Sequence, residues 1–156
     1  MKIDLRFILR AAVVAALYAA VTLLLAPISY GPLQFRVAEA LTLLPMLTPA
    51  AVPGLFVGCV VANLMSPAVT LLDVVFGSLA TLGAAILTRR LRNRPAVAAL
   101  PPVLINALVV GAVLAFSYNL PFWLTALEVG AGQLGVCYLL GLPLYYALRR
   151  MPHNIW

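Results

Sequence analysis

Long apolar runs are the feature that most constrains what this chain can fold into. The first run covers residues 8–26 and ends at Pro27, before the turn-rich stretch 29–32. A hydrocarbon core about 30 Å thick needs about 20 apolar residues in each helix that crosses it. Hydrophobic residues make up 65% of the chain and charged residues only 9%, whereas about a quarter of the residues in soluble domains are charged. The sequence therefore predicts an integral membrane protein.

The apolar pattern predicts about six transmembrane helices joined by short connections. They cover residues 8–26, 33–47, 49–65, 71–88, 97–117 and 121–148. Six such segments leave no room for a separate soluble domain, so we expect an all-α polytopic bundle that forms one membrane domain over residues 1–156. The segment 33–47 is short and polar at its start. It is expected to be either a short tilted helix or one whose outer end is shielded by protein.

Positive charge is unevenly divided between the two sides of this topology. With the N-terminus inside, the inner side carries Lys2, Arg6, Arg10, Arg89, Arg90, Arg92, Arg94, Arg149 and Arg150, and the outer side carries only Arg36. Cytoplasmic loops retain an excess of Lys and Arg, so both termini are expected on the cytoplasmic side of the cell membrane. The net charge of +6 is then explained by contact with anionic inner-leaflet lipid. A nucleic-acid partner has no supporting motif.

Polar side chains inside the membrane segments mark the candidate binding site, because burying them in hydrocarbon is costly. The candidates are Arg36, Glu39, Asn63, Asp73, Asn106, Glu128 and Gln133. The topology places the charged ones in the outer half of the bundle, which suggests one polar pocket open to the outside. Three acids against one base favour a ligand that donates hydrogen bonds or carries positive charge. Alternatively, Arg36 and Glu39 form an intrahelical salt bridge that lowers the cost of insertion.

Aromatic residues gather at the same end of the predicted bundle. They are Tyr30, Phe35, Tyr118, Phe122 and Trp123. An interfacial belt is their expected role, but a planar ligand would need one or two aromatic rings for stacking. Trp123 is therefore included among the candidate binding residues.

Two series of alanines run side by side along the first helix. Ala11, Ala15 and Ala19 form one series, and Ala12, Ala16 and Ala20 form the other. Small residues allow a second helix to approach closely. That second helix is either another part of this bundle, such as the segment with Gly54 and Gly58, or a separate membrane partner.

Motifs for catalysis and for cofactors are not found in the sequence. It has no GxxxxGK[ST], so the chain does not use ATP through a P-loop of its own, and no GxSxG or HExxH supports hydrolytic chemistry. Cys59 and Cys137 lie in apolar stretches without CxxC spacing and are expected to be packing residues. His153 lies in the terminal tail. We therefore expect no enzyme activity, no metal site and no cofactor in this chain.

Several stretches together resemble the QueT family. They cover residues 26–42, 53–59, 62–64, 73–81 and 100–107, and Glu128 with Gly132 and Gln133 extends the likeness over nearly the whole chain. Members of this family are substrate-binding S components of energy-coupling factor (ECF) transporters for queuosine precursors, which are 7-deazaguanine bases such as queuine, preQ1 or preQ0. The resemblance implies a six-helix fold that binds its ligand from outside.

The same resemblance implies partners. An S component associates with a transmembrane T component and two cytoplasmic ATPase subunits, which use the ATP, and it topples in the membrane to release its substrate. In related S components a strip of small residues on the first helix contacts the T component. Ala11, Ala15 and Ala19, with Ala12 and Ala16, match that strip.

The candidate residues suit a deazaguanine ligand. The base offers N1–H and an exocyclic amine side by side, which one carboxylate can accept, and several precursors also carry an aminomethyl cation. We expect Glu39 or Glu128 to accept from the base edge, with Asp73 as the other acid. The remaining amides would be further partners, and Arg36 would either bond the ring carbonyl or hold Glu39 in place. Alternatives are an S component for another small planar vitamin, a stand-alone transporter, a membrane enzyme or a structural subunit.

Overall fold

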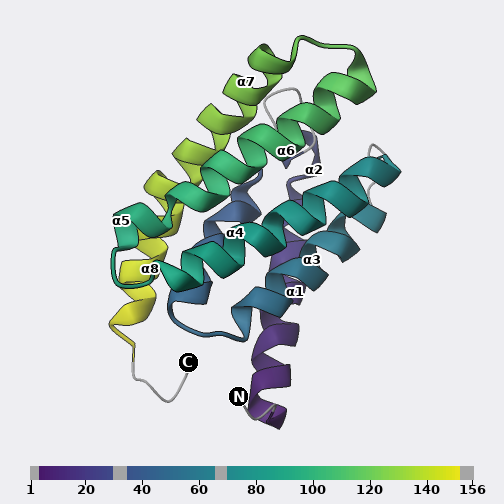
Figure 1. The fold of residues 1–156 in the computed structure, drawn as a ribbon. Helices are drawn as coiled ribbons and strands as arrows, with labels where there is room; N and C mark the ends of the chain where they lie inside the picture. The colour runs from purple at the N-terminus through teal and green to yellow at the C-terminus, as the bar shows by residue number, and fades with distance from the viewer. Residues whose placement is uncertain (1–3, 30–34, 66–69, 152–156) are drawn as a thin grey trace.

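The computed structural model describes residues 4–29, 35–65 and 70–151. Every regular element in these ranges is a helix, which confirms the all-α prediction (Figure 1). Within the described ranges, three continuous helices are long and apolar enough to cross a membrane: Leu5–Leu24, Pro95–Tyr118 and Phe122–Arg149. Lys2, Tyr30 and His153, which enter the sequence argument, lie outside the described residues.

The described part of the chain contains α-, 3₁₀- and π-helical elements. They are α1 (Leu5–Leu24), α2 (Ala26–Ser29), η1 (Val37–Met46), α3 (Ala51–Met65), η2 (Asp73–Gly77), α4 (Ser78–Arg90), α5 (Pro95–Ala98), α6 (Leu100–Tyr118), α7 (Phe122–Gly135), η3 (Val136–Gly141) and α8 (Leu142–Arg149). The first helix starts earlier than predicted because Asp4 caps it, accepting from the backbone N–H of Leu5 at 2.7 Å. The predicted last helix is a continuous rod whose middle turn, η3, is a π-helix.

The short second helix differs most from an ordinary membrane span. Residues 33 and 34, where it was predicted to begin, lie outside the described part of the chain, and the described segment η1 is a 3₁₀ helix. A 3₁₀ helix rises about 2.0 Å per residue against about 1.5 Å in an α-helix. The same number of residues therefore reaches about a third further across the bundle. Nearly all of η1 is buried, although it carries Glu39 and Thr42.

The remaining helices surround η1. Neighbouring contacts run from α1 to α3, α3 to α4, α4 to α6 and α6 to α7, and η1 contacts α1, α4 and η3. Figure 1 shows α3, α4, α6 and α7 running alongside one another in the bundle. Because η1 lies inside this arrangement, its polar side chains face other helices and are kept from lipid.

Two glycines of α3 bring it unusually close to α1. A Cβ added at Gly54 would lie 2.6 Å from the carbonyl oxygen of Ala11, and one added at Gly58 would lie 2.7 Å from that of Ala15. Real Cβ atoms do not approach backbone oxygens so closely, so only glycine fits at these two positions. The internal packing partner considered for the alanine series is therefore present.

One end of the bundle collects most of the described arginines. The N-terminal end of α1, the connection between α4 and α5, and the end of α8 all lie there (Figure 1). Arg89, at the end of α4, donates from Nη1 to the carbonyl oxygen of Pro45 at 2.9 Å, which ties the end of η1 to this side. Arg36 precedes the opposite end of η1. The charge asymmetry seen in the sequence is thus also an asymmetry between the two ends of the fold.

Candidate ligand-binding site

Glu39 is the centre of a buried hydrogen-bonded group. Its side chain lies on the first turn of η1 and is 1% exposed. The hydroxyl of Tyr18 on α1 donates to Oε1 at 2.5 Å, and Nδ2 of Asn106 on α6 donates to Oε2 at 3.3 Å. A carboxyl group this deep needs such donors, because an unpaired buried one is strongly unfavourable. Three helices that are distant in sequence therefore converge on one carboxyl group.

Gln133 joins this group from the opposite side through Cys137. The Cys137 thiol lies 3.8 Å from Oε1 of Gln133, 3.9 Å from the backbone oxygen of Glu39 and 3.9 Å from Oγ1 of Thr42. Thr42 in turn donates to the backbone oxygen of Glu39 at 2.5 Å. Cys137 is fully buried, in keeping with its expected packing role. Glu39, Asn106 and Gln133, three of the predicted site residues, thus share one polar core.

Asn63 and Asp73 form a second polar group, between α3 and η2. Nδ2 of Asn63 donates to the backbone oxygen of Asp73 at 3.1 Å. Oδ1 of Asn63 and Oγ of Ser78 are buried, and neither atom forms a hydrogen bond with another described residue. Most buried polar atoms are paired, so this acceptor on a candidate residue is open to a donor from beyond the described residues.

The carboxylate of Asp73 has a local structural role. Its Oδ2 accepts from the backbone N–H of Thr70 at 3.0 Å and from Oγ1 of Thr70 at 2.8 Å, while the N–H of Asp73 points back to the Thr70 hydroxyl at 3.4 Å. This reciprocal pattern is a capping box. The Thr-x-x-Asp spacing before an apolar run is the sequence signal for it, and it went unnoticed in the sequence argument.

The other predicted residues are placed differently. Arg36 is 5% exposed and precedes η1, and its carbonyl accepts from the N–H of Glu39 at 2.9 Å. Glu128 is half-buried on α7, and its offset of five positions from Gln133 turns the two side chains about 140° apart around the helix. Trp123 is 75% exposed and packs edge-on against Phe122. The structure does not bring Trp123 together with the polar core.

The aromatic ring of Phe35 lies against the C-terminal end of α7. Cε2 of Phe35 would be 3.6 Å from a Cβ added at Gly135. Gly135 follows Gln133 by two residues on α7 and directly precedes η3. Phe35 belonged to the predicted aromatic belt but was not singled out. Phe35 is half-buried and lies against the end of α7, whereas Trp123 is exposed.

Tyr18 is the main site residue that the sequence argument missed. It is fully buried in the middle of α1, whereas membrane tyrosines are enriched at the interfaces. A tyrosine at the centre of an apolar helix needs a partner for its hydroxyl. That mismatch between residue type and depth was the available signal.

The two alanine series of α1 lie in different environments. In the packed alanine series (Ala11, Ala15, Ala19), the first two are half-buried and the third is buried, and the backbones of Ala11 and Ala15 touch α3. In the exposed alanine series (Ala12, Ala16, Ala20), all three are exposed. Only the exposed series is open to a separate helix in this structure.

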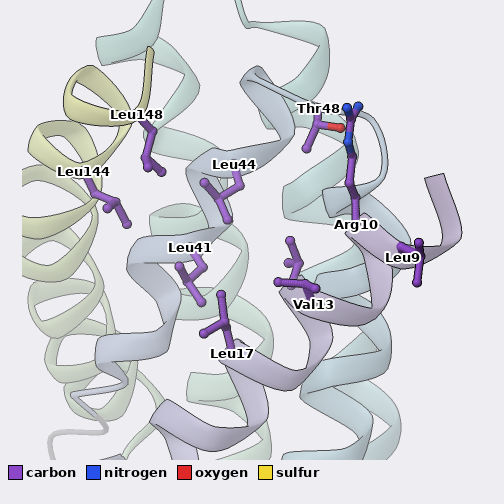
Figure 2. A pocket seen from close by; sticks show the side chains of 10 residues that line it. Leu9, Arg10, Val13, Leu17, Leu41, Leu44, Thr48, Leu144 and Leu148 are labelled. Carbon is purple, nitrogen blue, oxygen red and sulfur yellow. The ribbon is translucent and has the colours of Figure 1, made fainter. Parts of the chain in front are cut away.

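A wide apolar groove runs along α1 at its border with η1 and α8. It has a volume of about 460 Å³. Figure 2 shows leucines from all three helices lining it, with Arg10 and Thr48 at one end. Almost nothing polar faces this groove, so it is suited to an apolar partner and unsuited to a polar base.

Comparisons with known proteins point to transport. The family model described as QueT transporter matches residues 8–150. The queuosine precursor transporter QueT of Lactococcus lactis subsp. cremoris (strain MG1363) is 41% identical over 73 residues, which cover 46% of this chain and 42% of that protein. The aligned part thus spans less than half the length of this relative. No solved structure matches the chain.

Proposed function

This chain belongs to the QueT transporter family, a family of transporters and not of enzymes, and we propose that it is the substrate-binding S component of an ECF-type importer for queuosine precursors. Its ligands would be 7-deazaguanine bases such as queuine, preQ1 or preQ0. The six predicted transmembrane helices would form the S-component bundle. ATP would be hydrolysed by partner subunits.

The buried carboxyl group of Glu39 is the observation that carries the proposal. A carboxylate has about four acceptor positions, and Tyr18 and Asn106 occupy one on each oxygen. The remaining positions suit the adjacent N1–H and amine donors of a deazaguanine. Because Glu39 is 1% exposed, a ligand would have to displace neighbouring groups, and Tyr18 or Asn106 would then rebind to the complex.

Amides would supply the rest of the recognition. Oδ1 of Asn63 is a buried acceptor with no donor in the described chain, so it suits an amine of the ligand. Gln133, next to Cys137, would bond the ring edge opposite Glu39. Arg36 would bond the ring carbonyl or hold Glu39. A ligand lacking these donors and acceptors would leave buried groups unpaired, which is how such sites discriminate strongly.

The second acid and the stacking ring are less directly supported. Asp73 is the expected partner of an aminomethyl cation, although its Oδ2 already accepts two hydrogen bonds from Thr70. Glu128 is the alternative, since it is half-buried on α7. Phe35 is favoured over Trp123 for stacking because of its place beside Gly135.

Orientation and partners complete the proposal. The arginine-rich end would face the cytoplasm, with both termini, and the Glu39 end of η1 would face outward. The T component would dock on the exposed alanine series and on the apolar groove of Figure 2 beside it. The packed alanine series is already used by α3, so we exclude Ala11 and Ala15 from the proposed partner contact.

Binding to the purified protein tests the proposal. Queuine, preQ1 and preQ0 would be titrated into the detergent-solubilised chain by calorimetry, with guanine as the matched control that has N7 in place of a carbon. We expect at least one deazaguanine to bind much more tightly than guanine. A folded protein that binds none of the three would overturn the proposed substrate class, and binding of an unrelated planar vitamin in the same assay would replace it.

A further inference from the structure

A second cavity lies at the arginine-rich end, away from Glu39. It has a volume of about 240 Å³ and lies between the end of η1, the connection after α4 and the end of α8. The residues that line it are Met46, Leu47, Arg92, Asn93, Tyr145, Arg149 and Met151. Neither the carboxylates nor the amides of the proposed substrate site take part in it.

Two guanidinium groups face this cavity without an acid between them. Within residues 4–29, 35–65 and 70–151, neither Arg92 nor Arg149 forms an ion pair with a carboxylate. A third guanidinium, that of Arg89, is held beside the cavity by the carbonyl oxygens of Pro45 at 2.9 Å and Met46 at 3.4 Å. Both side chains line the same cavity, so an anion bound between Arg92 and Arg149 would be stabilised by both positive charges.

The rest of the lining indicates what kind of anion fits. Met46, Leu47 and Met151 provide apolar surface, and Asn93 provides a neutral polar group. A free inorganic ion would make no favourable contact with this apolar surface. A phospholipid has a phosphate joined to a glycerol and acyl chains, so it can contact both the arginines and the apolar side chains. The cavity also lies at the ends of membrane helices, at the depth where headgroups occur, and basic pockets between such helices bind acidic headgroups.

We propose that this cavity binds the phosphodiester headgroup of an anionic phospholipid, with Arg92 and Arg149 contacting the phosphate and the apolar side chains contacting the first part of the acyl chains. The site is separate from the one proposed for the substrate. Its occupancy would fix the relative positions of α4, α8 and the end of η1. It would also give the protein a preference for one class of lipid. General attraction between basic side chains and the membrane surface does not produce such a preference.

The test compares two charge-matched double variants of the full chain. Arg92→Gln with Arg149→Gln removes the two cavity arginines, whereas Arg94→Gln with Arg150→Gln removes two neighbours that do not line the cavity. Binding of phosphatidylglycerol and of phosphatidylcholine would be measured by native mass spectrometry of the detergent-solubilised protein. We expect the wild type to prefer phosphatidylglycerol, and the cavity variant to bind it about 30-fold more weakly, which is about fivefold for each arginine removed.

The control variant should retain nearly all of the wild-type affinity. An equal loss in both variants would show general surface attraction and would overturn the proposal. So would equal binding of phosphatidylglycerol and phosphatidylcholine by the wild type. Inorganic phosphate or glycerol phosphate would be added as a competitor. If either displaced phosphatidylglycerol at a concentration similar to that of the lipid, the cavity would be a free-anion site and the proposal would be overturned. Deazaguanine binding, measured in parallel, should be unchanged in both variants and would show that each is folded.

Discussion

Glu39→Gln changes the proposed binding site with the least change in shape. The side chain keeps its size but loses its charge, and one of its two oxygens becomes an NH₂ group. In the structure both oxygens accept hydrogen bonds, one from Tyr18 and one from Asn106. The single oxygen of a glutamine side chain can take the place of only one of these two acceptors. Its NH₂ group must then face the other donor. The same exchange places a donor where the ligand's donors would bind.

The magnitude follows from the kind of bond that is lost. A hydrogen bond to a charged group contributes about 1.5–3 kcal/mol, so losing one such bond to the ligand should raise Kd by about 10- to 150-fold. The effect on folding should be smaller, because removing a buried charge also removes its desolvation penalty. Glu39→Gln should thus change ligand affinity far more than it changes thermal stability.

Calorimetric titration with the best-binding deazaguanine measures this change, and a thermal unfolding curve in the same detergent measures stability. Asp4→Asn is the control, since it removes an equal charge from an exposed position at the N-terminal end of α1, outside the proposed site. If Glu39→Gln bound the ligand as tightly as wild type, Glu39 would be a structural acid and the base edge would have to be read elsewhere. Equal weakening by both variants would point to a general effect of the chain's charge.

Three further predictions concern the surroundings of this site. Tyr18→Phe leaves Oε1 of Glu39 without its donor, so it should weaken ligand binding by about tenfold, consistent with about 1.5 kcal/mol for the lost bond; an unchanged Kd in the same titration would remove Tyr18 from the site. Gly58→Ala should lower the unfolding free energy by about 1–3 kcal/mol through overpacking, because its Cβ would lie 2.7 Å from the carbonyl oxygen of Ala15. In the same thermal unfolding assay Gly83→Ala should cause no loss of stability, since its Cβ would lie 3.9 Å from Cδ1 of Ile105. Ala16→Trp, on the exposed alanine series, should abolish co-purification with the proposed T component while ligand binding persists. Ala15→Trp, on the packed alanine series, should instead destabilise the isolated chain. The reverse result would place the partner contact on the packed alanine series.

The long apolar helices could be predicted because composition alone determines them. Leu5–Leu24, Pro95–Tyr118 and Phe122–Arg149 coincide with apolar segments whose length matches a bilayer. The 3₁₀ geometry of η1 could not be predicted, since the same apolar residues suit an α-helix equally well and the choice depends on what packs around them. The π-helix η3 was hidden for the same reason, inside a segment that was predicted correctly as one rod.

The residues of the candidate site were predictable as types but not as pairs. Burial cost alone singled out Glu39 and Asn106, yet their contact joins positions 67 residues apart in sequence. The bond from Tyr18 to Glu39 joins positions 21 apart. A single sequence gives no signal for such contacts. The alanines of α1 show a similar limit, because a four-residue repeat marks both series and only the positions of Gly54 and Gly58 reveal which one is packed.

The 3₁₀ form of η1 links the fold to the polar core. With about three residues per turn, side chains three apart lie above one another, whereas in an α-helix they diverge by about 60°. Glu39 and Thr42 are three residues apart, so the Thr42 hydroxyl lies over the backbone oxygen of Glu39 and donates to it, and both oxygens lie near the Cys137 thiol. An α-helical η1 would turn Thr42 away from this position and would also be shorter. Long 3₁₀ runs are uncommon and often mark functional segments, so the geometry that makes this helix unusual is also what aligns its polar residues within an otherwise apolar protein.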